Sequence, residues 1–173
     1  MNADCFNFDY SYLQLPSEFY TLTSPLPVSS PKTVIINHEL ATSLGIDLGK
    51  LTEEDKADFF SGHRIIPNTT PFCQAYAGHQ YAHFTQLGDG RAHVLFEHVT
   101  PEGVRVDLQL KGSGKTPYSR GGDGRAALAP MLREYLISEA MHSLGIPTTR
   151  SLAVISSGDT ILRETAERGA VLA

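Results

Sequence analysis

The stretch LQLKGSGKTPYSRGGDGR, residues 108–125, organises this chain of 173 residues. It ends an alternating apolar strand, places Lys111 at the end of that strand, and continues through five glycines with Lys115, Arg120 and Arg125 among them. Glycines let backbone N–H groups approach a ligand closely, and basic side chains beside such a loop suit a polyanion such as the phosphates of a nucleotide. The stretch predicts either a phosphate-binding loop or an ordinary flexible connection between a strand and a helix.

A P-loop is the first alternative to consider, because Gly114, Lys115 and Thr116 spell the end of that motif. The motif requires a glycine five positions before its second glycine, and residue 109 is Gln. Pro117 also follows where the P-loop would wind its helix, and proline removes a backbone donor there. The sequence therefore argues against a P-loop.

The residues before the loop predict a β-hairpin, with strands over 93–99 and 104–111 and a turn at 101–103. In the second strand apolar residues alternate with polar ones, so one face is apolar and Lys111 projects from the other. The alternative for Lys111 is a solvated lysine at a strand end, which is the usual environment of this side chain.

Residues 128–144 predict the strongest helix of the chain, with Gly145 as its stop. Glu134 is expected to reach Lys111 if this helix packs beside the sheet. An exposed Lys–Glu pair contributes only about 0 to 1 kcal/mol, so its value would lie in positioning. The apolar stripe expected to face the core consists of Leu128, Leu132, Tyr135, Leu136 and Ala140.

Residues 151–156 and 160–165 predict a second hairpin with a turn at 157–159. The apolar run 169–173 starts a further strand and the sequence stops within it, so we expect a chain truncated at its C-terminus.

The N-terminal region predicts short elements rather than a separate core. Residues 1–31 are rich in aromatic residues and proline, which indicates an irregular arm laid over the body of the protein. A short strand over 32–37 and a short helix over 38–44 follow. Thr52 is expected to cap a second helix, which Gly62 ends.

Composition restricts the class of protein. The net charge of -5 and the pI near 5.8 argue against a nucleic-acid binder, which usually carries a basic excess. No apolar run is long enough to span a bilayer, and the N-terminal residues lack the order of a secretion signal. Cys5 and Cys73 form no metal or disulfide motif, which makes a cytoplasmic location the default.

His79 and His83 are candidate metal ligands, because residues four apart share one face of a helix and Cys73 is nearby in sequence. No third ligand has a recognised spacing, so the pattern favours ordinary hydrogen-bonded histidines and predicts no metal site in this chain.

Several longer motifs occur in the order found in a known family. They are AYAGHQYAHF (75–84), LGDGRA (87–92), LQLKGSGKTPYSRGGDGRA (108–126), REYLISEAMHSLGIPTTR (133–150) and the closing GAVL. With these motifs the chain resembles the N-terminal part of the selenoprotein O family, protein adenylyltransferases with a protein-kinase-like fold. The motifs cover most of residues 70–173, which makes coincidence implausible.

The resemblance implies an α+β fold in which residues 71–173 form a kinase-like small lobe, with an antiparallel sheet and a packed helix. Residues 1–70 are then an irregular extension whose short helices pack on that lobe. It also implies that ATP lies in the reverse orientation to that in a kinase, with its α-phosphate facing the acceptor. AMP would pass to a Ser, Thr or Tyr hydroxyl of a protein substrate, and pyrophosphate would leave.

The resemblance also implies roles for individual residues. Lys111 would neutralise phosphate charge and Glu134 would hold its ammonium group in place, which suits a reaction that depends on positioning and charge. The nucleotide-binding residues implied in this way are Gly88, Gly90, Arg91, Lys111, Asp123 and Gly124.

The chain departs from the family pattern in two respects. Ala82 stands where the family usually has a glycine. The Mg²⁺ ligands, the catalytic base and the arginines that grip the far phosphates lie further along in the family, so they are expected beyond residue 173. The fragment alone is therefore expected to be inactive and to bind ATP weakly.

Two other functions remain open. A conventional ATP-dependent phosphotransferase would use Lys111 and Glu134 equally well, but ordinary kinases lack a basic glycine-rich segment between this strand and helix. A non-catalytic nucleotide-binding module would need no metal ligands. The expected partners are ATP and protein substrates, with neither nucleic acid nor membrane.

Overall fold

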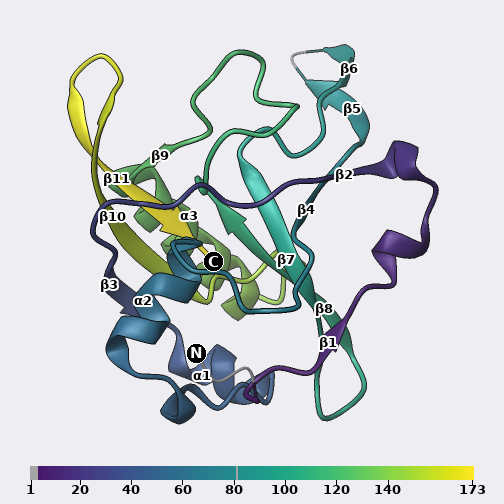
Figure 1. Ribbon diagram of the computed structural model, residues 1–173, viewed down its shortest axis with the longest axis vertical. Coiled ribbons are helices and arrows are strands. Elements are labelled where there is room, and N and C mark those ends of the chain that lie inside the picture. The colour runs from purple at the N-terminus through teal and green to yellow at the C-terminus, as the bar shows by residue number, and fades with distance from the viewer. Residues whose placement is uncertain (1–3, 81) are drawn as a thin grey trace.

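The structure is a computed structural model in which residues 4–80 and 82–173 are described. Its centre is one antiparallel sheet (Figure 1). In order across this sheet the strands are β2 (Tyr20–Leu22), β4 (Phe72–Gln74), β7 (Ala92–Val99), β8 (Arg105–Lys111), β11 (Ala166–Leu172), β10 (Ala153–Leu162) and β3 (Lys32–Ile36). The short strands β1 (Phe8–Asp9) and β9 (Ala126–Ala127) pair with β7 and β11. The α+β class with an antiparallel sheet is thus confirmed.

Three α-helices and a small second sheet complete the described fold. The second sheet is a hairpin of β5 (Ala77–Gln80) and β6 (His83–Gln86). It projects at the same end of the molecule as the tip of β10 and β11, at the top of Figure 1. The α-helices are α1 (His38–Ser43), α2 (Glu53–Ser61) and α3 (Leu128–Ser143), and the 3₁₀ turns are η1 (Tyr12–Gln14), η2 (Ser17–Phe19) and η3 (Leu48–Lys50).

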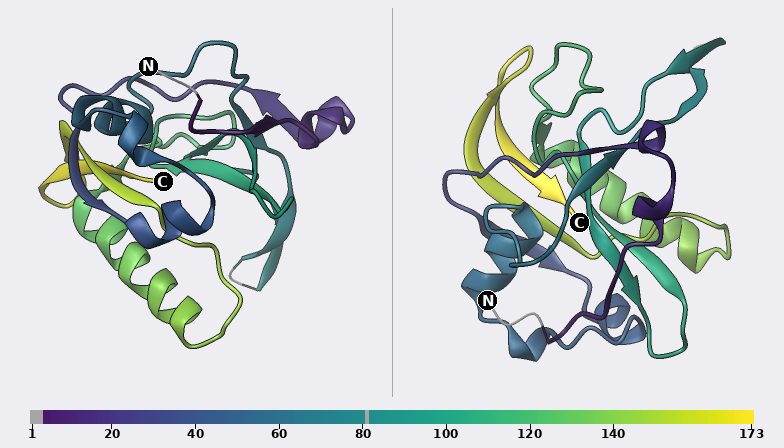
Figure 2. Two further views of the ribbon diagram at one scale, coloured as in Figure 1. Left: turned by 90° about the horizontal axis from the view of Figure 1, so that it is seen from below. Right: turned by 45° about the vertical axis from the view of Figure 1, so that its right-hand side comes forward.

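Successive side chains of β10 and β11 point to opposite faces of the sheet, and both faces are buried there. Ala153 and Ile155 of β10 join the cluster with α1 and α2, whereas Val154 joins the cluster with α3. In β11, Val171 faces α1 and α2, and Leu172 faces α3. Figure 2 accordingly shows α3 on one side of the sheet and α1 and α2 on the other.

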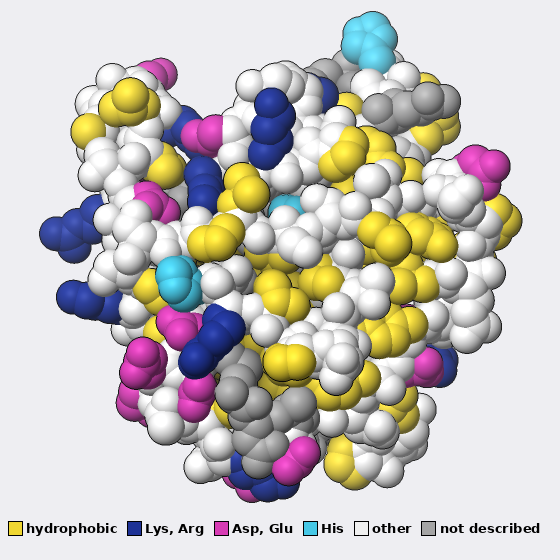
Figure 3. All heavy atoms as spheres, in the orientation of Figure 1, with side chains coloured by type: hydrophobic (Ala, Val, Ile, Leu, Met, Phe, Trp, Pro, Cys, Tyr) yellow, Lys and Arg dark blue, Asp and Glu magenta, His cyan; other side chains and the backbone are white. Residues whose placement is uncertain are grey.

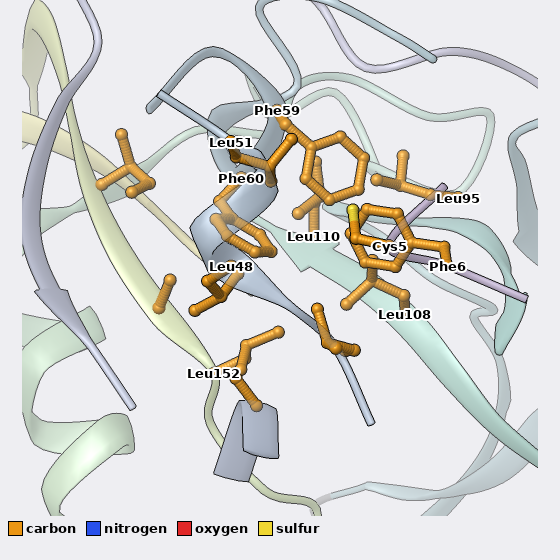
Figure 4. Close-up of a cluster of buried hydrophobic side chains, with 14 of the residues drawn as sticks. Cys5, Phe6, Leu48, Leu51, Phe59, Phe60, Leu95, Leu108, Leu110 and Leu152 are labelled. Atoms are coloured by element: carbon orange, nitrogen blue, oxygen red, sulfur yellow. The ribbon is translucent and has the colours of Figure 1, made fainter. Parts of the chain in front are cut away.

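The larger core lies between the sheet and the N-terminal helices (Figure 4). Phe59 and Phe60 of α2 are fully buried there against Leu108 and Leu110 of β8. The start of α2 has the predicted Thr52 cap, reinforced by a capping box, and its end has Gly62 at φ +74°. These signals fix α2 at the place where its phenylalanines meet the sheet.

The N-terminal region is built into the main sheet rather than merely laid on it. It contributes β1, β2 and β3, while the rest of residues 4–31 is irregular apart from two 3₁₀ turns. Phe6 of this arm packs against Phe59 and Phe96 with ring centroids 5.0 and 5.2 Å apart. The arm is thus irregular over most of its length, but β1 and β2 make it part of the sheet, and the domain division at residue 70 stays a prediction.

The predicted turn at 157–159 is wrong. β10 runs through these residues, and its register against β11 shifts between Ser156 and Thr160. Gly158, at φ +79°, accommodates the irregularity, and the chain turns after Leu162 instead. Because β10 pairs with β11 both before and after these residues, the turn-like sequence forms a bulge within the strand.

The predicted helix over 128–144 is confirmed, but its buried stripe differs. Met131 and Tyr135 are buried, whereas Leu136, which we expected in the core, is 64 % exposed and Ala140 is also exposed. The reason is that α3 contacts the sheet with one narrow face, which Met131 and Tyr135 fill.

Candidate functional site

Lys111 and Glu134 meet at the point where β8 ends beside α3. Lys111 is the last residue of β8, and its neighbours across the sheet are Ala92 of β7 and Leu172 of β11. Its Nζ lies 2.6 Å from Glu134 Oε2. Both side chains are more than a third exposed, 38 % and 37 %, so the pair adds little stability and its effect is to fix the ammonium group.

Glu134 also lies close to a second positively charged side chain, Arg91. Its Oε1 lies 3.9 Å from Nη2 of Arg91, which precedes β7. The backbone carbonyl of Arg91 accepts a hydrogen bond from Gly112 N at 2.7 Å, so the two chain segments on either side of the pair are joined. One carboxylate thus holds two positive side chains close together.

The loop 87–91 crosses this site in a fixed conformation. The N–H groups of Leu87 and Gly88 both donate to Tyr76 O at 3.1 Å, and Asp89 N donates to Gln74 O at 2.8 Å. At Gly88, φ is +63° and a Cβ would lie 2.5 Å from Gln74 O, so only glycine fits. Within residues 4–80 and 82–173, the N–H groups of Gly90 and Arg91 have no hydrogen-bond partner.

Asp89 anchors this loop to the sheet, and sequence reasoning missed it. The carboxylate accepts hydrogen bonds from Gln74 N at 3.0 Å and from Gln109 Nε2 at 3.3 Å, and the residue is buried. Burial raises the pKa of Asp89 above its usual range. An aspartate between two glycines is typical of an ordinary turn, so the sequence does not predict its hydrogen bonds to Gln74 and Gln109.

The stretch 112–125 forms the other wall of the site. Gly114 N donates to Gly124 O at 3.1 Å, and at Gly124, with φ +69°, a Cβ would overlap the Gly114 carbonyl. Asp123 accepts from Nη1 and Nη2 of Arg163 at 2.8 and 2.9 Å, and from Arg125 N at 2.9 Å. Hydrogen bonding to Arg163 lowers the pKa of Asp123. This carboxylate is thus occupied within the protein.

These walls enclose a cavity of about 770 Å³. Among the described residues that line it, five are basic and one is acidic, Asp123. In Figure 3 Lys and Arg side chains gather between the tip of the β10–β11 hairpin and the neighbouring loop. The basic residues that line the cavity are Arg91, Lys111, Arg120, Arg125 and Arg163. In a chain of net charge -5, these residues form a local excess of positive charge.

All six residues implied by the resemblance line this one cavity, although they come from two loops and a strand end. Their individual roles stay predictions. The lining residues that sequence reasoning did not single out are Tyr76, Tyr118, Ser119 and Arg163. Ser119 and Tyr118 lie inside a quoted motif, whereas Arg163 lies about 40 residues further on and is brought in only by the β10–β11 turn.

His79 and His83 do not share a helical face, because they lie on the two strands of the β5–β6 hairpin. His79 lines the cavity, and Cys73 is buried in β4. In the described part of the chain, no three His, Cys, Asp or Glu side chains form a group that could hold a metal ion. We assign no Mg²⁺ ligand among the described residues.

A second cavity, of about 1070 Å³, lies between α3, β8 and α1. Apolar side chains such as Ile137 and Met141 line one part of it, and the polar face of β8, with Asp107 and Gln109, lines another. Lys111 lines both cavities, so the Lys111–Glu134 pair marks their boundary.

The described helices include none that is both long and apolar enough to cross a membrane.

Comparison with known proteins gives a consistent match. The model of the family described as protein adenylyltransferase SelO matches residues 4–173. The chain is 60 % identical over 172 residues to protein nucleotidyltransferase YdiU of Anoxybacillus flavithermus, covering 99 % of this chain and 36 % of that relative. It is 61 % identical over 165 residues to the protein of the same name from Geobacillus kaustophilus, covering 95 % and 34 %. The chain thus spans about a third of the length of these relatives.

Proposed function

This chain belongs to the family of protein adenylyltransferase SelO, and from this premise we propose that it is the nucleotide-binding part of an enzyme that transfers AMP from ATP to protein hydroxyls. The observation that carries the proposal is the Lys111–Glu134 pair at 2.6 Å on the edge of the basic cavity. A lysine on a strand, held by a glutamate on the following helix beneath a glycine-rich loop, is the arrangement by which kinase-like folds hold ATP phosphates.

In this proposal residues 71–173 are a kinase-like small lobe. Three features support this. β8 carries Lys111, the following helix α3 carries Glu134, and the loop before β7, the hairpin partner of β8, carries Gly88 and Gly90. Residues 1–70 extend the sheet and cover its other face.

The chemistry requires charge neutralisation more than covalent participation by the protein. An acceptor hydroxyl of Ser, Thr or Tyr would attack the α-phosphorus, and the bond to the β-phosphate oxygen would break, with pyrophosphate leaving. Lys111 and Arg91 would neutralise phosphate charge, and the N–H groups of Gly90 and Arg91 would donate to phosphate oxygens. Mg²⁺ would supply further neutralisation, and its ligands are not among the described residues.

The reversed orientation of ATP is part of the same proposal. In it the α-phosphate faces the acceptor, whereas a kinase presents the γ-phosphate. A phosphotransferase is the alternative, since the Lys111–Glu134 pair would serve either reaction. The basic loop 112–125, which makes one wall of the cavity, favours AMP transfer in this comparison.

We also propose a cytoplasmic location, because the two cysteines of the sequence belong to no disulfide or metal-binding motif. The proposed partners are ATP and protein substrates with Ser, Thr or Tyr acceptors.

Substitution of Lys111 tests the site. In the full-length protein with Mg²⁺, a protein acceptor and ATP labelled at the α-phosphate, Lys111→Ala is expected to reduce AMP transfer by about a hundredfold or more, because a fixed cation at the phosphates is lost. Lys115→Ala is the matched control, since Lys115 is exposed and does not line the cavity. Equal activity in the two variants would argue against the assigned role.

A further inference from the structure

Three residues of the segment 114–119, GKTPYS, contact the loop 87–91, namely Thr116, Tyr118 and Ser119, and none of them has an individual role in the function proposed so far. Thr116 is buried, and its Oγ1 donates to Asp89 O at 2.6 Å. Ser119 Oγ donates to Gly90 O at the same distance. Two hydroxyls therefore hold two successive carbonyl groups of the loop.

Both hydroxyls are themselves fixed within the segment. Thr116 Oγ1 accepts from Tyr118 N at 3.1 Å, and Ser119 Oγ accepts from Thr116 N at 2.8 Å. The turn is closed by Ser119 N, which donates to Thr116 O at 3.2 Å. Because each hydroxyl proton is already committed to a loop carbonyl, neither hydroxyl can rotate freely.

Tyr118 fills the space beneath the loop. A Cβ on Gly88 would lie 2.7 Å from the Tyr118 ring, and one on Gly90 would lie 3.1 Å from Tyr118 O. The Tyr118 hydroxyl is 2.9 Å from Thr21 Oγ1, which ties the segment to the N-terminal arm. Tyr118 thus packs closely against the loop at both glycines.

The contacts of the two carbonyl groups also fix the direction of the N–H groups that follow them in the chain. In a trans peptide the C=O of one residue and the N–H of the next point in opposite directions. Holding the carbonyls of Asp89 and Gly90 toward Thr116 and Ser119 therefore turns the N–H groups of Gly90 and Arg91 the other way. These are the two N–H groups of the loop without a partner in the described part of the chain, and both residues line the basic cavity.

We propose that Thr116 and Ser119 are positioning residues, which hold the N–H groups of Gly90 and Arg91 as a preformed site for one phosphate group. Two adjacent N–H groups with a fixed common direction bind an anion without reorganisation. That the phosphate belongs to ATP rests on the proposed function, whereas the preformed site itself does not.

The test is a titration of the ¹⁵N-labelled 173-residue chain with sodium pyrophosphate, followed by NMR. The wild type is expected to show shifts of the Gly90 and Arg91 amide signals. Ser119→Ala and Thr116→Val are each expected to weaken pyrophosphate binding by about tenfold, the equivalent of one misdirected hydrogen bond to an anion. Thr116→Ser keeps a hydroxyl and is expected to bind like the wild type.

Matched controls carry the same chemical changes far from the site. Ser143→Ala removes a hydroxyl that donates to Glu139 O at 2.9 Å in α3, and Thr42→Val removes one that donates to His38 O at 2.9 Å in α1. Both are expected to bind pyrophosphate like the wild type. Their weakening to the same degree as Ser119→Ala would show a general loss of structure and overturn the inference.

The inference also fails if the wild type shows no shift at Gly90 and Arg91, or if Ser119→Ala and Thr116→Val bind pyrophosphate unchanged. Failure of the proposed function looks different. In that case pyrophosphate binds at these two amides and the variants weaken it, but the full-length protein transfers no AMP.

Discussion

At the scale of single residues, Ala82 carries backbone strain. Its φ is +62°, a left-handed conformation that costs an alanine roughly 1 to 2 kcal/mol relative to the right-handed one. Its neighbour Tyr81 lies outside the described residues. The glycine that the family usually has at this position would adopt such a φ freely.

Ala82→Gly is therefore expected to stabilise the β5–β6 hairpin by about 0.5 to 1 kcal/mol, since relief of strain exceeds the added entropy of the unfolded chain. Slower amide exchange in the hairpin would show this. Ala77→Gly, in β5 and without a positive φ, is the control and is expected to speed exchange. Faster exchange in both variants would contradict the account.

His93 gives a residue-scale prediction for pH. It is fully buried, with Nδ1 2.8 Å from Ser113 Oγ, and burial lowers its pKa to about 4. Below about pH 6.5 the unfolded chain binds a proton at this histidine and the folded chain does not. Stability is thus lost as the pH falls from about 6.5 to about 4, by roughly 1 kcal/mol per pH unit.

Urea unfolding at several pH values measures this loss. His93→Gln cannot take up the proton, so its free energy of unfolding is expected to fall less steeply over this range. Identical slopes for the variant and the wild type would mean that His93 does not stay neutral on folding.

At the scale of elements, Glu139 ties α3 to the start of β10. Its carboxylate accepts from Arg150 at 2.6 and 2.9 Å, from Ser151 N at 3.0 Å and from Asn37 Nδ2 at 2.8 Å. These contacts, Arg150 first, lower the pKa of Glu139 to about 2. Asn37 also caps α1, so one carboxylate joins elements on both sides of the sheet.

Because the folded pKa is depressed, the stabilisation from Glu139 is complete above about pH 4.5 and is lost as the pH falls toward 2. Glu139→Gln is expected to cost on the order of 3 kcal/mol at pH 7 and much less near pH 2 to 3. Glu134→Gln on the same helix is expected to cost about 0 to 1 kcal/mol at pH 7. Chemical unfolding of both variants at pH 7 and 3 measures the contrast, and equal costs at pH 7 would refute it.

The elements also show which parts of the fold local sequence can predict. The bounds of α2 follow from Thr52 and Gly62, and the β7–β8 hairpin follows from alternation, because these signals lie within the elements themselves. The residues 157–159 have the local signal of a turn, but β10 continues through them as a bulge and pairs with β11 on both sides of it. Local sequence does not report such partners.

Some residues of the candidate site can likewise be predicted from the sequence and others cannot. The Lys111–Glu134 pair is predictable from the sequence, because the family resemblance implies it and the helix that carries Glu134 packs beside the sheet. Arg163 and Asp89 are not, since their positions depend on a distant turn and on burial. His79 and His83 lie on a hairpin and not on a helix, and a spacing of four residues alone does not distinguish the two.

At the scale of the whole molecule, an acidic chain holds a basic cavity. The net charge of -5 argued against nucleic acid, and the five basic residues around the cavity point instead to a compact polyanion. Loops from three parts of the sheet edge converge there, while the N-terminal helices cover the opposite face of the sheet. In the described part of the chain, the sheet and the N-terminal helices thus support the loops that line the basic cavity.

The most direct test of the central claim compares ATP labelled at the α-phosphate with ATP labelled at the γ-phosphate, using the full-length protein, Mg²⁺ and a protein acceptor. The account predicts label on protein from the α position only, and none from either position with the 173-residue chain alone. Label from the γ position only would make the protein a phosphotransferase and contradict the reversed orientation of ATP. Transfer of the α label by the 173-residue chain would contradict the claim that it lacks essential groups.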